Sequence, residues 1–121
     1  QAKKSKTTVT QGDNIVVTSG TNADGSVNYE VATAKDVNFD KVTVGNVVTD
    51  GATGKISGLT AGDVSSTSTE AINGSQLNTA QNSTSSIIGG GVTNNAGSLT
   101  GPFTTNGNSY SNIAEAIEDQ A

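Results

Sequence analysis

Residues 77–91 read Leu77-Asn78-Thr79-Ala80-Gln81-Asn82-Ser83-Thr84-Ser85-Ser86-Ile87-Ile88-Gly89-Gly90-Gly91. Apolar and small residues recur here at spacings of three and four, which is the period of one face of an α-helix. The glycines at 89, 90 and 91 end the pattern, because each costs about 1 kcal/mol inside a helix and favours left-handed or extended backbone. We therefore expect a helix that stops abruptly at this break.

Two rows of side chains on this helix could face partner helices. The first seam consists of Leu77, Ala80, Thr84 and Ile87, and the second of Leu77, Gln81, Thr84 and Ile88. Both seams are thin and partly polar, so an isolated helix would be marginal, whereas three copies around one axis would close either seam. Gln81 or Thr84 would then hold water or an anion and fix the register, or would lie on a solvated face if off the seam. The spacing alone leaves the register open.

Helix-start signals occur twice. Thr67-Ser68-Thr69-Glu70 fits a capping box and predicts that the first helix begins near residue 67, so that it includes Ile72. Asn112, with Glu115 three residues later, predicts a second helix. Ile113, Ile117 and Gln120 continue a heptad seam on that helix. The order is therefore helix, non-helical insert, helix.

Strand patterns occupy the first half of the chain. Residues 7–33 predict a β-hairpin, because apolar residues alternate with polar ones on both sides of the turn-forming residues 21–26. Residues 37–49 repeat the alternation in shorter form, with Val37 and Phe39, then Val42 and Val44, two apart. Residues 50–54 supply a further turn. Such short strands need a cover for their apolar face.

Composition argues against a self-sufficient core. Of the 121 residues only 31% are apolar, and the aromatics are two Phe and two Tyr, with no Trp or Met. A lone chain would struggle to offset an ordering entropy of roughly 1.5 kcal/mol per residue. Disorder is one alternative, but a single Pro and clear alternation favour order through association. We expect a mixed β and α fibrous fold built from several copies of the chain.

Few side chains offer chemistry. The chain has no His and no Cys, which removes the usual general base, the strongest nucleophile and every thiolate metal site, so we predict no enzyme, cofactor or metal. Acidic pairs among Asp24, Glu30, Asp36 and Asp40 would lack a deep cleft. A net charge of −5 disfavours nucleic acid. The basic cluster Lys3, Lys4 and Lys6 is most simply a solvated end.

One longer motif carries a family resemblance. Residues 56–62, Ile-Ser-Gly-Leu-Thr-Ala-Gly, followed by residues 69–77, Thr-Glu-Ala-Ile-Asn-Gly-Ser-Gln-Leu, resemble the neck of the trimeric autotransporter adhesins of Gram-negative bacteria. Glu70 stands where that family more often has Asp. The stretch from Ile87 to Ile117 resembles the family's glycine-marked FGG insertion, with Ile88 in place of Phe. Residues 34–45 are similar to its Trp-ring head domain, although no Trp is present.

The resemblance implies a domain order and a function. It divides the chain into a β-rich head module (1–54), a neck (55–77), a coiled coil (78–88), an insertion (89–111) and a coiled-coil continuation (112–121). It implies a parallel homotrimer on the bacterial surface, anchored in the outer membrane by a part outside these residues. The segment would project and space binding domains for attachment and autoagglutination. The axial residues would be Ile72, Leu77, Ile87, Ile88, Ile113 and Ile117.

Two other functions remain open at this point. The segment could itself bind host extracellular matrix or abiotic surfaces, with Tyr29 or Tyr110 as an anchor. It could instead belong to a trimeric phage tail fibre, which the neck motif argues against.

Overall fold

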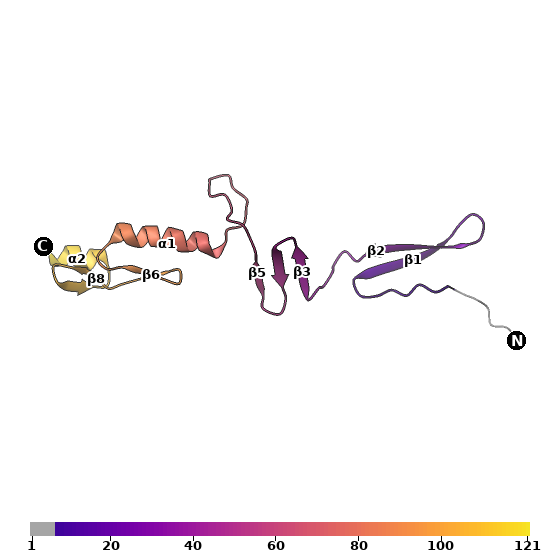
Figure 1. Ribbon diagram of the computed structural model, residues 1–121, viewed down its shortest axis with the longest axis horizontal. Helices are drawn as coiled ribbons and strands as arrows, with labels where there is room; N and C mark the ends of the chain where they lie inside the picture. Colours follow the sequence, from indigo (N-terminus) through magenta and orange to yellow (C-terminus); the bar gives the residue numbers. More distant parts are fainter. Residues whose placement is uncertain (1–6) are drawn as a thin grey trace. The chain divides into compact units, whose positions relative to one another are not determined.

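The computed structural model describes residues 7–121, so Lys3, Lys4 and Lys6 lie outside the described part. The chain divides into two compact units. The first runs to Thr43 and includes Val48–Lys55, and the second contains Val44–Val47 and Ile56–Ala121. The described elements are small β-sheets and two helices, which confirms the expected mixture of β and α structure (Figure 1).

The predicted N-terminal hairpin is confirmed. Strands β1 (Ile15–Thr21) and β2 (Val27–Thr33) are antiparallel, and Val17 is opposite Val31. In the turn, an Asp24 carboxylate oxygen accepts hydrogen bonds from the Ser26 hydroxyl at 2.5 Å and the Ser26 amide at 3.0 Å. These two bonds, the hydroxyl first, lower the pKa of Asp24 from its ordinary value. Gly25 takes a φ of +87°, as a tight turn requires.

The expected strand at residues 37–39 is wrong, because regular pairing begins later. A three-stranded sheet in the order β3–β4–β5 consists of Lys41–Val44, Val47–Asp50 and Lys55–Ser57. The backbone of Asn38 is instead held by the Asn14 side chain, which donates to its carbonyl at 2.9 Å and accepts from its amide at 2.8 Å. Asn14 therefore supplies the hydrogen bonds that a neighbouring strand would otherwise give.

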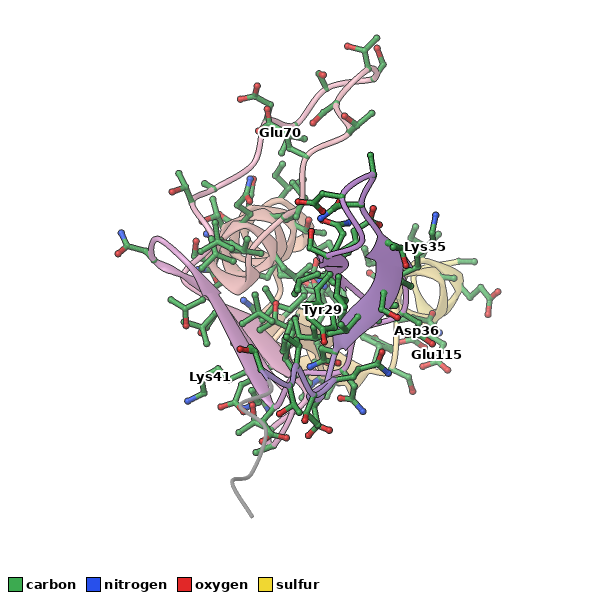
Figure 2. The ribbon with its side chains drawn as sticks, turned by 90° about the vertical axis from the view of Figure 1, so that its right-hand side faces the viewer. Tyr29, Lys35, Asp36, Lys41, Glu70 and Glu115 are labelled. Atoms are coloured by element: carbon green, nitrogen blue, oxygen red, sulfur yellow. The ribbon has the colours of Figure 1, made fainter. Side chains whose placement is uncertain are left out.

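The predicted turn at residues 50–54 is confirmed. The Gly54 amide donates to the Asp50 carbonyl, and the Ala52 amide donates to the Asp50 side chain. Asp50 also lies 3.8 Å from the Lys41 ammonium, whose side chain is 58% exposed and points outward in Figure 2. An ion pair this exposed contributes at most about 1 kcal/mol.

The first helix begins later than the sequence predicts. Helix α1 spans Gly74–Ile88, its N-cap is Asn73, and Gln76 completes the capping box. The capping box at Thr67 is wrong, because the Glu70 carboxylate accepts a hydrogen bond from the Asp63 amide instead of reaching back to residue 67. Glu70 lies on the loop ahead of α1 (Figure 2), and so does Ile72.

The end of α1 agrees with the prediction. Gly89 caps the helix with a φ of +71°, and its amide donates to the Ser85 carbonyl at 2.9 Å. Two short hairpins follow, formed by β6 (Thr93–Asn95) with β7 (Ser98–Thr100) and by β8 (Phe103–Thr105) with β9 (Asn108–Tyr110). Helix α2 (Ile113–Asp119) closes the chain.

The start of α2 is where the sequence places it. The Asn112 side chain accepts a hydrogen bond from the Glu115 amide at 2.9 Å, and Glu115 reaches back to the amide of Ser111. In the predicted capping box Glu115 would accept from the Asn112 amide, whereas in the structure it accepts from the amide one residue earlier. Each hairpin lies beside one helix, β6–β7 along α1 and β8–β9 along α2 (Figure 1).

Candidate interaction surface

Apolar side chains in this chain lie mainly on the surface. Within residues 7–121, Ala116 is the single buried residue, with 4% of its surface exposed. Most large apolar side chains of the described residues are therefore exposed to solvent in the single chain.

The structure brings only some of the six residues expected at a trimer axis together within one chain: Ile88 and Ile113 line one depression, and Ile113 and Ile117 line another. Five are exposed: Ile72 by 48%, Leu77 by 53%, Ile87 by 85%, Ile113 by 41% and Ile117 by 66%. Ile88 is half-buried. Exposure of this degree on large aliphatic side chains leaves much of their transfer free energy unrealised in the single chain.

Part of α1 is covered by the chain itself. The Gln81 side chain donates to the Gly97 carbonyl at 2.8 Å, in the turn of the β6–β7 hairpin. Asn94 of β6 donates to the side chains of Asn78 and Asn82, each at 3.0 Å, and its oxygen accepts from the Gly97 amide. Amide side chains thus fasten the hairpin to one flank of the helix.

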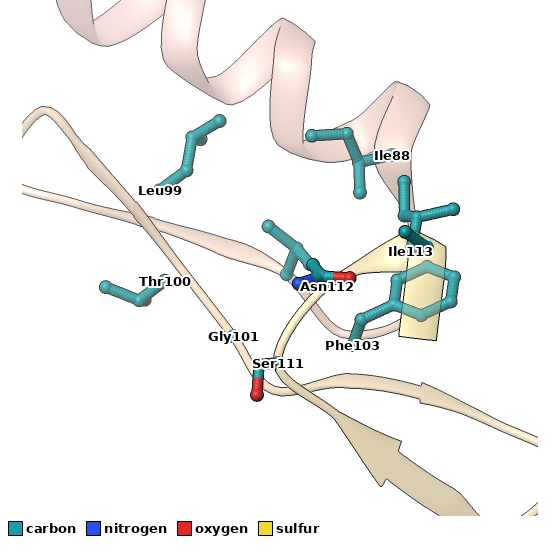
Figure 3. A pocket seen from close by; sticks show the side chains of 10 residues that line it. Ile88, Leu99, Thr100, Gly101, Phe103, Ser111, Asn112 and Ile113 are labelled. Atoms are coloured by element: carbon teal, nitrogen blue, oxygen red, sulfur yellow. The ribbon is translucent and has the colours of Figure 1, made fainter. Parts of the chain in front are cut away.

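An open apolar depression of about 430 Å³ lies where α1, β8 and α2 meet. Figure 3 shows Ile88, at the end of α1, facing Phe103 and Ile113. Gly90 takes a φ of +64°, and a Cβ there would collide with the Phe103 ring. Gly90 is therefore required both by backbone conformation and by the space that Phe103 occupies.

The segment resembling a neck is organised by one glutamine. The Gln76 side chain accepts from the amides of Gly62 and Asn73 and donates to the Gly62 carbonyl at 2.6 Å. The Asn73 side chain in turn donates to the carbonyl of Leu59 at 3.0 Å. Sequence reasoning missed both roles, although Asn73 followed by Gln76 is itself a capping-box pattern.

Two glycines of the same segment allow close backbone contact. A Cβ on Gly58 would collide with the Asn46 carbonyl oxygen, and one on Gly62 with the Ala71 carbonyl oxygen. Gly58 also takes a φ of +79°. Any other residue at these two positions would force the backbone apart.

Ionisable groups are scattered over the surface. In the part of the chain that the structure describes, His, Cys, Asp and Glu form no group of three or more that could hold a metal ion. The hydrogen bond from Tyr110 to the Asp119 carboxylate raises the pKa of Tyr110 from its ordinary value. Neither described helix has the length and apolar content of a membrane span.

Comparison with known proteins gives one strong likeness in sequence. No protein-family model matches the chain. Over 66 residues, which is 54% of the chain, it is 73% identical to the trimeric autotransporter adhesin AtaA of Acinetobacter sp. strain Tol 5. The matched stretch is thus similar to part of a trimeric adhesin. The chain spans 2% of the length of that relative.

A solved structure gives a weaker likeness. It is a C-terminal stalk fragment of AtaA from Acinetobacter sp. Tol 5, fused to GCN4 adaptors. The TM-score is 0.45 and the identity 18%, over 95% of this chain and 84% of that one.

Proposed function

We propose that this chain is a structural segment of a bacterial surface adhesin fibre, folded as a parallel homotrimer. The observation that carries the proposal is 73% identity over 66 residues to a trimeric autotransporter adhesin. The exposed aliphatic side chains of α1 and α2 support it, because three identical copies would bury them against one another.

The role within the fibre is mechanical. Residues 1–54 would form a β-rich head module, 55–77 a neck, 78–88 a coiled coil, 89–111 an FGG-like insertion and 112–121 the continuing coil. The observed order of small sheets, α1, two hairpins and α2 is compatible with this division. The segment would project and space binding domains during attachment and autoagglutination. The fibre would be secreted and anchored in the outer membrane, and other parts of it would meet host matrix or abiotic surfaces.

Sedimentation equilibrium of the chain tests the proposal. We expect a mass three times that of the 12.0 kDa chain, and a stable monomer would contradict it. Leu77→Asp should dissociate the trimer, because three carboxylates would be forced together near the axis.

The matched control is Ser86→Asp, which adds the same charge on the opposite side of α1, an exposed position. We expect this variant to remain trimeric. Equal dissociation of the two variants would mean that Leu77 has no axial role.

A further inference from the structure

Helix α1 has two flanks that differ in exposure. All four residues of the first seam are exposed: Leu77, Ala80, Thr84 and Ile87. Gln81, Ser85 and Ile88 are half-buried. At about 100° per residue the centres of these two rows lie roughly 90° apart around the helix. One flank is therefore covered and its neighbour is open.

The covered flank contains the residues that distinguish the second seam. Gln81 is engaged by the Gly97 carbonyl at 2.8 Å, and Ile88 faces Phe103 and Ile113 (Figure 3). A second seam at the axis would require the β6–β7 hairpin to move and the Gly97 carbonyl to lose its partner. Losing a hydrogen bond of this kind costs about 1 kcal/mol or more.

The open flank is suited to identical copies of the same helix. Residues Gly74–Ile88 contain no charged side chain, so parallel copies meet without charge repulsion. The Thr84 hydroxyl donates to the Ala80 carbonyl of its own helix at 2.9 Å, so burial would leave its proton satisfied. Leu77 and Ile87 on this flank are 53% and 85% exposed, so contact with copies of the same helix would bury apolar surface that the single chain leaves in water.

We propose that the partner of this flank is two further copies of the chain, which meet along Leu77, Ala80, Thr84 and Ile87. Gln81 contacts the chain's own β6–β7 hairpin, Ile88 faces Phe103 and Ile113, and neither lies at the axis. Thr84 forms the polar layer and needs no bound anion to satisfy its proton. This inference rests on the proposed trimer and specifies the register that the trimer uses.

Single cysteines test the register, because the native chain contains none. Ala80→Cys and Ile87→Cys place sulfur atoms at the proposed axis, whereas Gln81→Cys and Ile88→Cys place them on the covered flank. Under mild oxidation we expect the first two variants to form disulfide-linked dimers on a non-reducing gel. The other two should remain single chains.

The outcomes separate the two proposals. A monomer by sedimentation overturns both the trimer and the register. A trimer in which Gln81→Cys and Ile88→Cys cross-link as well as, or in place of, the other pair overturns the register alone. Circular dichroism establishes that each variant is folded.

A second pair of variants keeps the test decisive if a cysteine variant fails to fold. Ala80→Ile enlarges an axial layer and should raise the midpoint of thermal unfolding of the trimer. Ser86→Ile adds the same side chain on the outer face and should not raise it. An equal effect of the two substitutions would overturn the proposed register.

Discussion

Two helices of this chain each pack against a hairpin: α1 against β6–β7, which we call the first pair, and α2 against β8–β9, the second pair. The two pairs have the same arrangement but use different side chains. In the first pair, amide side chains join α1 to β6–β7, because the Asn94 side chain donates hydrogen bonds to Asn78 and Asn82. In the second pair, two hydrogen bonds join β8–β9 to α2 and its C-cap. Tyr110 donates to Asp119, and Asn106 donates to Gln120 at 3.2 Å. Both hairpins turn through two residues at positive φ.

The difference shows how little interior one chain builds. The shorter helix, α2, buries Ala116 against its hairpin, whereas α1 has no buried residue among its fifteen. The residues at the open ends of the hairpins differ in the same sense. Thr93 is opposite Thr100 in the first hairpin, whereas two aromatic residues, Phe103 and Tyr110, are opposite each other in the second. The polar hairpin β6–β7 is held to its helix by hydrogen bonds, whereas the aromatic residues of β8–β9 also exclude water from the contact.

The largest expected effect lies at the junction of the two pairs. Gly90→Ala should lower the free energy of unfolding by about 2–4 kcal/mol, because it adds a Cβ at positive φ and forces the Phe103 ring aside. Thermal unfolding followed by circular dichroism measures the change.

Gly91→Ala is the matched control, since Gly91 has a φ of +83° but open space around its Cβ position. It should cost about 1–2 kcal/mol. Equal losses would mean that the Phe103 contact contributes nothing to joining the pairs.

Asn94→Ala breaks the amide fastening of the first pair. We expect a loss of about 1–2 kcal/mol and faster hydrogen exchange of the β6 and β7 amides, because the hydrogen bonds to Asn78, Asn82 and the Gly97 amide are removed. Amide exchange followed by NMR provides the measurement.

Asn95→Ala, on the exposed adjacent position of β6, is the control and should exchange as the native chain does. If both substitutions loosen the hairpin alike, strand propensity and not the amide network holds it.

A smaller effect comes from the turns. Ala96 takes a φ of +50° and Asn106 a φ of +51° at equivalent positions, and alanine tolerates this conformation less well than asparagine. Ala96→Asn should therefore stabilise the first pair by about 0.5–1 kcal/mol, seen as a higher thermal midpoint. A neutral or lower midpoint would show that the two turns are not equivalent.

The smallest effect is a loss of stability at alkaline pH that is confined to the second pair. Because the pKa of Tyr110 is raised above its ordinary value of 10.0, the stability it contributes is present below pH 10 and is lost as the pH rises through the raised value. In a Tyr29→Phe background, phenolate absorbance should show Tyr110 titrating above pH 10. Asp119→Asn should bring the titration back toward its ordinary value, and an unchanged curve would contradict the assigned cause.

Local signals predicted the elements with strong local causes. The Gly89–Gly91 break ends α1, Asn112 caps α2, and the alternation of residues 15–33 forms a hairpin, since each depends on near neighbours alone. The start of α1 was mispredicted at Thr67, because Glu70 bonds to the Asp63 amide outside any helix. The strand at 37–39 was mispredicted because the Asn14 side chain holds that backbone across 24 positions of sequence.

Composition alone shows that one chain has too few apolar and aromatic residues to build a substantial interior. The consecutive glycines at 89–91 also fix where α1 ends, because they act through backbone conformation alone. The sequence could not choose between two seams on α1, because both fit the same spacing. The flank that the hairpin covers is fixed only in the folded chain, because it depends on the Gln81 side chain donating to the Gly97 carbonyl, sixteen residues away in the sequence.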